Sequence, residues 1–285
     1  MMRSSRRQFL RSGGAAALAL VAGSELLAAC GSSSAKAFTL APRVSNGKLL
    51  VPGESRVAVS LVDASQTLMS TGPKTLTGSI HDSSDKIVAK VSADRHDAGI
   101  PQAYWPFRFT IDKPGFYKLR VDGDDGHGGD FGVFDPAEVT MPFIGSKIAP
   151  FDTPTVADHR GVEPYCSLTP NPCTLHDITL TDALKSGKPV AYMVGTPAHC
   201  QTGACAPALE FLVAAHQRIG SAVSMVHADV YADNAGTKFA PAVDALGIDY
   251  EPVVYLCKPG GAIADRLDGI WDQIELDARL AALTG

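Results

Sequence analysis

Two cysteines five positions apart, Cys200 and Cys205, are the residues of this 285-residue chain best suited to chemistry. An apolar segment predicted as a strand precedes them, and a segment with helical periodicity begins directly after them. A helix N-terminus carries partial positive charge and free N–H groups, and both favour a thiolate, the nucleophile of disulfide exchange. A second cysteine nearby can resolve the mixed disulfide. The pair therefore predicts thiol–disulfide exchange.

The C-x-x-x-x-C spacing restricts how this pair can meet. Five residues within a regular helix would turn the two side chains roughly 140° apart. The pair can close only if Cys200 lies in the loop and Cys205 near the first helical turn, with Gly203 supplying flexibility. We expect Cys200 to be the exposed attacking thiol and Cys205 the resolving thiol. A purely structural disulfide is the alternative.

The elements around the pair follow from hydrophobic periodicity. Thr179 is expected to cap a helix with Asp182 three residues later, and Leu209 and Leu212 lie on the apolar stripe of another. The predicted order after the first helix is β-α-β-α-β-β-α. Helices are expected over 179–186, 204–219, 237–246 and 272–283, and strands over 189–194, 222–228, 253–257 and 262–267.

This order, the cysteine turn and two further segments resemble the thioredoxin-like superfamily over residues 174–285. The segments are 249–256, Asp-Tyr-Glu-Pro-Val-Val-Tyr-Leu, and 258–261, Lys-Pro-Gly-Gly. The resemblance implies that Pro252 is the cis-proline that faces the active cysteines and shapes the substrate groove. It further implies an oxidoreductase that takes protein or small thiols through mixed disulfides and needs no metal or organic cofactor.

Two other functions compete with this one. The superfamily includes the copper-delivering Sco proteins, which use two thiolates and a distant histidine, a soft site suited to Cu(I). His176, His216 and His227 are candidates for that third ligand. The third possibility is a redox-silent module in which the N-terminal half holds a partner.

Two residues beside the pair bear on its chemistry. Glu251 precedes Pro252, and a carboxylate facing the sulfurs would disfavour a thiolate. His199 precedes Cys200, where it would assist proton transfer or stabilise a thiolate, or else lie as an ordinary solvated loop histidine.

Three more cysteines have structural interpretations. Cys166 and Cys173 bracket a stiff loop with two prolines, which favours a structural disulfide over a redox relay. Cys257 ends an apolar strand, and we expect a buried free thiol there.

The N-terminal half has a different composition. Partial alternation predicts short strands over 56–62, 74–80, 107–111 and 117–121, separated by turn signals that contain Gly and Pro. This pattern predicts an immunoglobulin-like β-sandwich over 38–136 without an inter-sheet disulfide, followed by a Pro-rich connector over 137–173. The acidic loop over 122–130 lacks EF-hand spacing and is expected to be solvated.

The N-terminus predicts export. Residues 5–10, Ser-Arg-Arg-Gln-Phe-Leu, resemble the twin-arginine motif, and residues 27–30, Leu-Ala-Ala-Cys, resemble a bacterial lipobox. The apolar segment over 13–23 is much shorter than the ~20 residues of a membrane-spanning helix. We expect a signal peptide over 1–29, acylation (such as palmitate) of Cys30 and a tether over 30–37. The chain would then be lipid-anchored on the outer face of a bacterial membrane.

The charge balance limits the partners. The formal net charge is −5, and phosphate backbones require clustered Lys and Arg. We therefore expect no nucleic-acid partner.

Overall fold

The computed structural model describes residues 38–43 and 47–285, which belong to one compact unit. The expected signal peptide over 1–29, the acylated Cys30 and the tether to residue 37 lie outside the described residues. Within the described ranges, no helix has the length and apolar character needed to cross a membrane.

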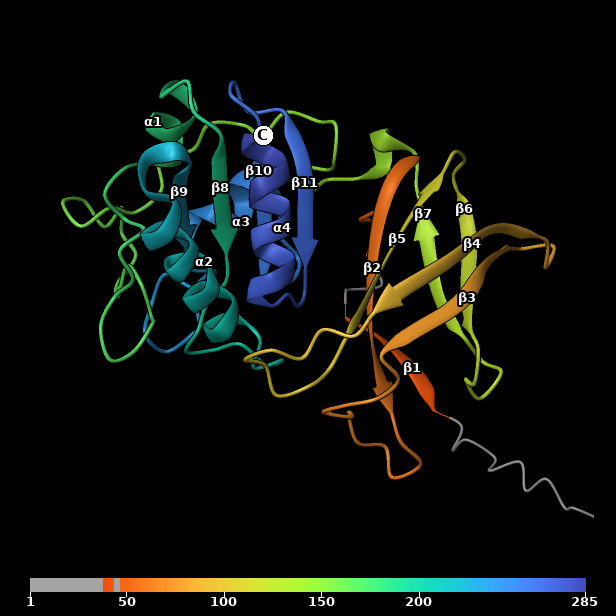
Figure 1. The fold of residues 1–285 in the computed structure, drawn as a ribbon. Helices are drawn as coiled ribbons and strands as arrows, with labels where there is room; N and C mark the ends of the chain where they lie inside the picture. Colours follow the sequence, from red (N-terminus) through yellow and green to blue (C-terminus); the bar gives the residue numbers. More distant parts are fainter. Residues whose placement is uncertain (1–37, 44–46) are drawn as a thin grey trace, which may run out of the picture. The chain divides into compact units, whose positions relative to one another are not determined.

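The N-terminal half of the described chain is built from two antiparallel sheets (Figure 1). One sheet has the order β1-β2-β5 and the other β4-β3-β6-β7. The strands predicted over 56–62, 74–80, 107–111 and 117–121 correspond to β2, β3, β5 and β6. The strand bounds are β1 Thr39–Pro42, β2 Gly53–Val62, β3 Thr75–Asp82, β4 Ile87–Asp94, β5 Trp105–Ile111, β6 Gly115–Val121 and β7 Gly129–Val133, and a short 3₁₀ helix, η1, follows at Pro136–Glu138.

The two sheets share one apolar core. Alternate residues of β2 and β5, such as Leu61 and Phe107, are fully buried against Ile80 of β3 and Leu119 of β6. A period of two places one face of each strand inward, which is why the partly alternating segments form these strands.

The C-terminal half has the predicted β-α-β-α-β-β-α order after its first helix. Its sheet order is β11-β10-β8-β9, with β8 parallel to β9 and antiparallel to β10 (Figure 1). The bounds are α1 Leu180–Lys185, β8 Val190–Val194, α2 Cys205–Ile219, η2 Gly220–Ala222, β9 Ser224–Ala228, α3 Pro241–Leu246, β10 Val253–Cys257, β11 Ile263–Asp268 and α4 Gln273–Thr284.

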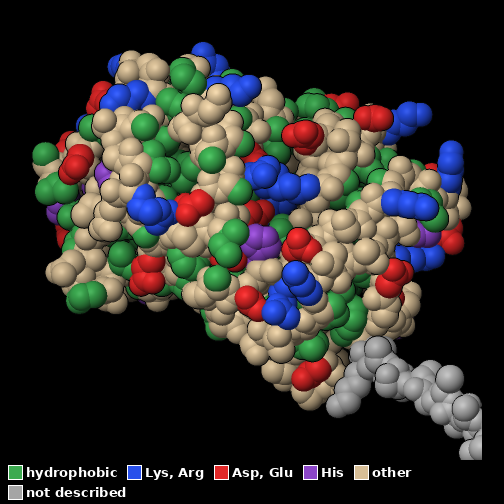
Figure 2. Space-filling view, in the orientation of Figure 1, with side chains coloured by type: hydrophobic (Ala, Val, Ile, Leu, Met, Phe, Trp, Pro, Cys, Tyr) green, Lys and Arg blue, Asp and Glu red, His purple; other side chains and the backbone are tan. Residues whose placement is uncertain are grey.

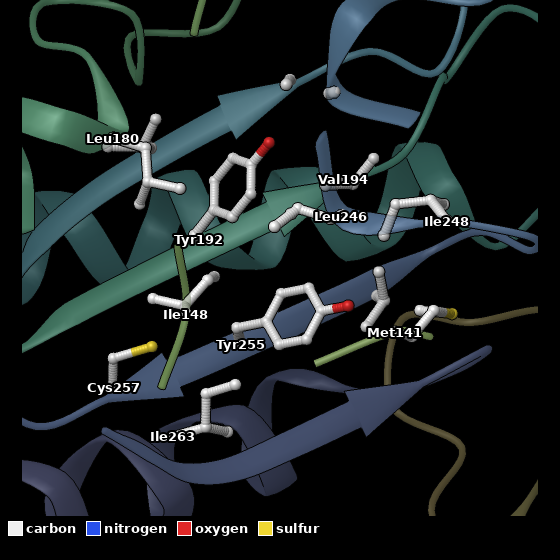
Figure 3. Close-up of a cluster of buried hydrophobic side chains, with 14 of the residues drawn as sticks. Met141, Ile148, Leu180, Tyr192, Val194, Leu246, Ile248, Tyr255, Cys257 and Ile263 are labelled. Atoms are coloured by element: carbon white, nitrogen blue, oxygen red, sulfur yellow. The ribbon is translucent and has the colours of Figure 1, made fainter. Parts of the chain in front are cut away.

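This sheet is buried on both faces, so its strands are continuous apolar runs. Tyr192 of β8 and Tyr255 of β10 pack with helices α1 and α3 (Figure 3). The neighbouring Met193 and Leu256 pack on the opposite face with α2 and α4. The thiol of Cys257 belongs to the first of these clusters, is fully buried and is free, as predicted. Burial in this apolar cluster raises its pKa to about 12.

Two helix starts show how local sequence sets these boundaries. The Thr179 hydroxyl accepts a hydrogen bond from the backbone N–H of Asp182 at 3.0 Å, which is the predicted cap. Helix α3 begins at Pro241 rather than at the predicted residue 237. Proline has no backbone N–H to contribute to a helix interior but is well suited to the first helical position, so the helix starts there.

A buried ion pair joins β2 to the C-terminal helix. The Arg56 guanidinium donates two hydrogen bonds to the Glu275 carboxylate, at 2.7 and 2.8 Å. Tyr104 donates a third, at 2.7 Å. Arg56 and Glu275 are only 2% and 5% exposed, and the nearby guanidinium lowers the pKa of Glu275 to about 2 although burial opposes this. Removing Arg56 would leave the buried Glu275 carboxylate with only the more distant Arg108 guanidinium, at 3.5 Å, as a cationic partner.

On the face shown in Figure 2, Lys and Arg side chains are mixed with Asp and Glu rather than gathered in one continuous basic area.

Candidate redox site

The loop between β8 and α2 holds the cysteine pair. Cys200 lies in this loop, Cys205 is the first residue of α2, and a disulfide joins them with 5.9 Å between the Cα atoms. This is the placement that the C-x-x-x-x-C spacing requires. Gly203 adopts a φ of 66° between them, a conformation that glycine reaches without strain.

The two sulfurs differ in access to solvent. Cys205 is fully buried, whereas Cys200 is partly exposed. An incoming thiolate must approach a disulfide sulfur directly, so Cys200 is the sulfur open to attack. The exposure therefore distinguishes the two cysteines in the direction predicted from the sequence.

The start of α2 supplies hydrogen bonds to Cys200. The backbone N–H of Cys205 points to the Cys200 sulfur at 3.2 Å, and the Thr202 hydroxyl lies 3.3 Å from it. Ala204 precedes the helix and has no side-chain acceptor for the first N–H groups. Free N–H groups and the helix dipole both stabilise negative charge at this point. A Cys200 thiolate released on reduction would thus be stabilised.

Pro252 lies at the same edge of the sheet as this loop. The Glu251–Pro252 peptide bond is cis. Val253, the next residue, pairs with Val194, the last residue before the loop. A Cβ placed on Gly195 would lie 3.2 Å from the Pro252 Cβ. The proline therefore packs against the start of the cysteine loop.

Glu251 is tied to the same loop. Its carboxylate accepts a hydrogen bond from the backbone N–H of Thr196. Burial raises the pKa of Glu251 to about 7, and the nearby Asp229 acts in the same direction. A carboxyl with this pKa is partly protonated at neutral pH, so it disfavours a thiolate less than a fully ionised carboxylate would.

A groove of about 370 Å³ borders the cysteine loop. His199 and Thr202 line it from the loop, and Tyr231 and Phe239 line it from the segment before α3. The Tyr231 and Phe239 rings stack with centroids 5.6 Å apart, and Phe239 is 66% exposed. His199 packs edge-on against Tyr231 and lies 3.1 Å from the carbonyl of Asn234. The two aromatic residues could not be predicted from the sequence, because they come from a loop with no regular period.

The structure differs from the expectation for Cys166 and Cys173. Both are free, buried thiols rather than a disulfide. The two sulfurs instead lie 3.8 and 3.6 Å from His227 Nδ1, and the backbone N–H of Cys173 points to the Cys166 sulfur at 3.3 Å. His227 on β9 thus contacts both thiols, which the sequence of the loop alone could not show.

The histidines considered as copper ligands do not gather around the Cys200–Cys205 pair. His176 and His227 group with Cys166 and Cys173, and His216 lies half-buried on α2 with its Nδ1 atom buried and unpartnered. In the described part of the chain, the four-residue group is the one cluster of His, Cys, Asp and Glu whose geometry suits a metal ion.

No family model and no curated protein matches the chain. Among solved structures, the chain is similar to a Chlorobium tepidum protein provisionally named thiol:disulfide interchange protein DsbE, with 14% sequence identity and a TM-score of 0.36. The match covers 50% of this chain and 98% of that one.

Proposed function

We propose that this protein is a thiol–disulfide oxidoreductase that acts through Cys200 and Cys205. The observation that carries the proposal is the disulfide at the start of α2, with one sulfur partly exposed and the other buried. The element order, the cysteine loop and the cis-Pro252 beside it support membership of the C-terminal half in the thioredoxin-like superfamily.

The exchange begins with the oxidised pair. A substrate thiolate attacks the Cys200 sulfur, the Cys200–Cys205 bond breaks, and its electron pair leaves on Cys205 as a thiolate. A second substrate thiolate then attacks the substrate sulfur of the mixed disulfide. The substrate disulfide forms, Cys200 leaves as a thiolate, and the protein is reduced by two electrons. Reduction of a substrate disulfide is the same sequence in reverse.

The surrounding residues support each step. The Cys205 N–H stabilises the Cys200 thiolate in the reduced state. Glu251, with a pKa of about 7, takes up or releases a proton near neutral pH within the same loop network. The groove formed with Tyr231 and Phe239 offers an apolar surface for the segment that flanks a substrate cysteine.

Turnover of single variants tests this proposal. Cys200→Ser should abolish both oxidation of a dithiol peptide and reduction of a disulfide peptide. Cys205→Ser should stop turnover while still forming a mixed disulfide. Cys257→Ala is the matched control, since it removes a free buried thiol from the same half without touching the pair. Wild-type rates in both active-site variants would contradict the proposal, and a pair that a strong dithiol cannot reduce would favour the redox-silent module.

The site of action is part of the proposal. The twin-arginine and lipobox resemblances support export and acylation of Cys30, followed by anchoring on the outer face of a bacterial membrane. That compartment permits stable disulfides. The antiparallel sheets that share a core over β1–β7 support an immunoglobulin-like sandwich as the N-terminal domain. Mass spectrometry of the membrane fraction would detect acylated Cys30 in the wild type and none in Cys30→Ala.

A further inference from the structure

A second cluster of reactive side chains lies apart from the disulfide. Cys166, Cys173 and His176 come from the connector and the segment directly after it, and His227 comes from β9. Their ligand atoms all lie within 4.8 Å of one another. The two histidines are fully buried and the two cysteines are 3% and 6% exposed. Four soft or borderline donors therefore converge in a space closed to solvent.

The distances between these atoms fit a tetrahedral metal centre. Zinc bonds of about 2.3 Å to sulfur and about 2.05 Å to nitrogen imply about 3.6 Å between sulfur and nitrogen ligands and about 3.4 Å between two nitrogens. His227 Nδ1 lies 3.8 and 3.6 Å from the Cys166 and Cys173 sulfurs. It lies 3.2 Å from His176 Nε2. All three distances are within about 0.2 Å of the tetrahedral values.

The hydrogen bonds of the histidines fix which nitrogens face the centre. His227 Nε2 lies 2.8 Å from the Gly195 carbonyl, and His176 Nδ1 lies 3.2 Å from the Pro154 carbonyl. A carbonyl oxygen only accepts, so these two nitrogens carry the protons. His227 Nδ1 and His176 Nε2 are then left with lone pairs that face each other. Two lone pairs at this distance repel unless a proton or a metal ion lies between them. Metal-bound histidines commonly donate their other N–H to a carbonyl, as both histidines do here.

From these contacts we infer that Cys166, Cys173, His176 and His227 form a structural Zn²⁺ site. Two thiolates balance the charge of the ion, which lowers the cost of burying it. Four protein ligands fill the tetrahedron and leave no position for a substrate, which is typical of structural rather than catalytic zinc. The Cys173 N–H bonded to the Cys166 sulfur gives that thiolate the hydrogen bond that buried sulfur ligands usually have.

The site would attach the connector to the sheet beside the redox loop. His227 donates to the carbonyl of Gly195, and Gly195 directly precedes Thr196, whose N–H bonds Glu251. The ion would thus hold the segment from Cys166 to His176 against β9 at the base of the cysteine loop. This inference is independent of the redox proposal, because none of its ligands belongs to the Cys200–Cys205 pair.

The metal content of the full chain tests the inference. Protein purified under reducing conditions from zinc-supplemented cells should contain about one zinc per chain by elemental mass spectrometry. Replacing zinc with Co²⁺ should give a thiolate charge-transfer band and the intense visible bands of a tetrahedral centre. Cys166→Ser and His176→Gln should each lose most of the zinc. Cys257→Ala and His216→Gln are the controls, a buried thiol and a half-buried imidazole outside the cluster, and both variants should keep the zinc.

Alkylation of the wild type avoids dependence on variants that fail to fold. Cys166 and Cys173 should resist iodoacetamide until a chelator is added. The Cys200→Ser chain should retain its zinc, because Cys200 is not one of the ligands. A folded wild type without zinc, a Cys166–Cys173 disulfide in the zinc-supplemented preparation, or preferential retention of copper would each overturn the assignment.

Discussion

Glu251 offers a quantitative test of the electrostatics around the cysteine loop. Its pKa rises from an ordinary value of 4.5 to about 7, mainly because the carboxyl is buried. At about 1.36 kcal/mol per pH unit, this difference corresponds to about 3 kcal/mol. The carboxyl is not fully buried, so about 2–3 kcal/mol is the expected effect once solvent screening is included.

The direction in which stability changes with pH follows from proton binding to Glu251. Between pH 4.5 and 7 the folded chain holds a proton on Glu251 that the unfolded chain has lost. Stability therefore falls as the pH rises through this window, and the full cost is present above pH 7. Glu251→Gln removes the charge but keeps an oxygen that can accept from the Thr196 N–H. The variant should match the wild type near pH 4.5 and be more stable by about 2–3 kcal/mol near pH 8.

Urea unfolding of the oxidised chain at several pH values measures this effect. The difference between variant and wild type isolates Glu251, because the other titrating groups are common to both. Glu210→Gln, an exposed position on α2, is the matched control and should show no such pH-dependent gain. A gain that is constant across the window, or a loss at pH 8, would refute the assignment of a raised pKa caused by burial.

Two further predictions concern the buried ion pair between Arg56 and Glu275 and the groove beside the cysteine loop. Arg56→Met should lower the free energy of unfolding by about 3 kcal/mol, because the buried Glu275 then keeps only the Arg108 guanidinium, 3.5 Å away, as a cationic partner. The exposed pair Arg218–Asp277 is the control, and Arg218→Met should lose less than about 1 kcal/mol. If urea unfolding gave equal losses of unfolding free energy for Arg56→Met and Arg218→Met, the role of burial would be contradicted. Phe239→Ala should raise the KM for a protein dithiol and leave the rate with a small dithiol unchanged, whereas Phe116→Ala, an exposed ring on β6, should change neither. A fall in the small-dithiol rate of Phe239→Ala would place this ring in the chemistry rather than in substrate binding.

The sequence was most informative where burial forces a regular pattern. The strand Val253–Cys257 was predicted with its observed bounds, because a strand buried on both faces is a continuous apolar run. Strand β4 was not identified. Most of its residues, including Ile87 and Val88, are exposed or half-buried, so it lacks the alternation that marks a strand with one face in the core.

Part of the candidate site could likewise be predicted from the sequence and part of it could not. The geometry of Cys200 and Cys205 could be inferred locally, because five residues at the start of a helix leave few ways to close a disulfide. The environment of Cys166 and Cys173 could not be inferred from the local sequence. His227 lies 54 positions beyond Cys173, and it reaches both thiols only because β9 packs against the segment after them, where the His227 N–H donates to the Leu175 carbonyl. The short interval from Cys173 to His176 was the one available signal of a metal half-site.

The central claim is that Cys200 is the attacking sulfur and Cys205 the resolving one. Its most direct test is peptide mapping of the Cys205→Ser chain after incubation with a disulfide-bonded peptide. One peptide adduct per chain is expected, located on Cys200, released by a dithiol, and absent from Cys200→Ser. Failure to form any adduct on Cys200, together with an adduct on Cys205 in the Cys200→Ser chain, would contradict it.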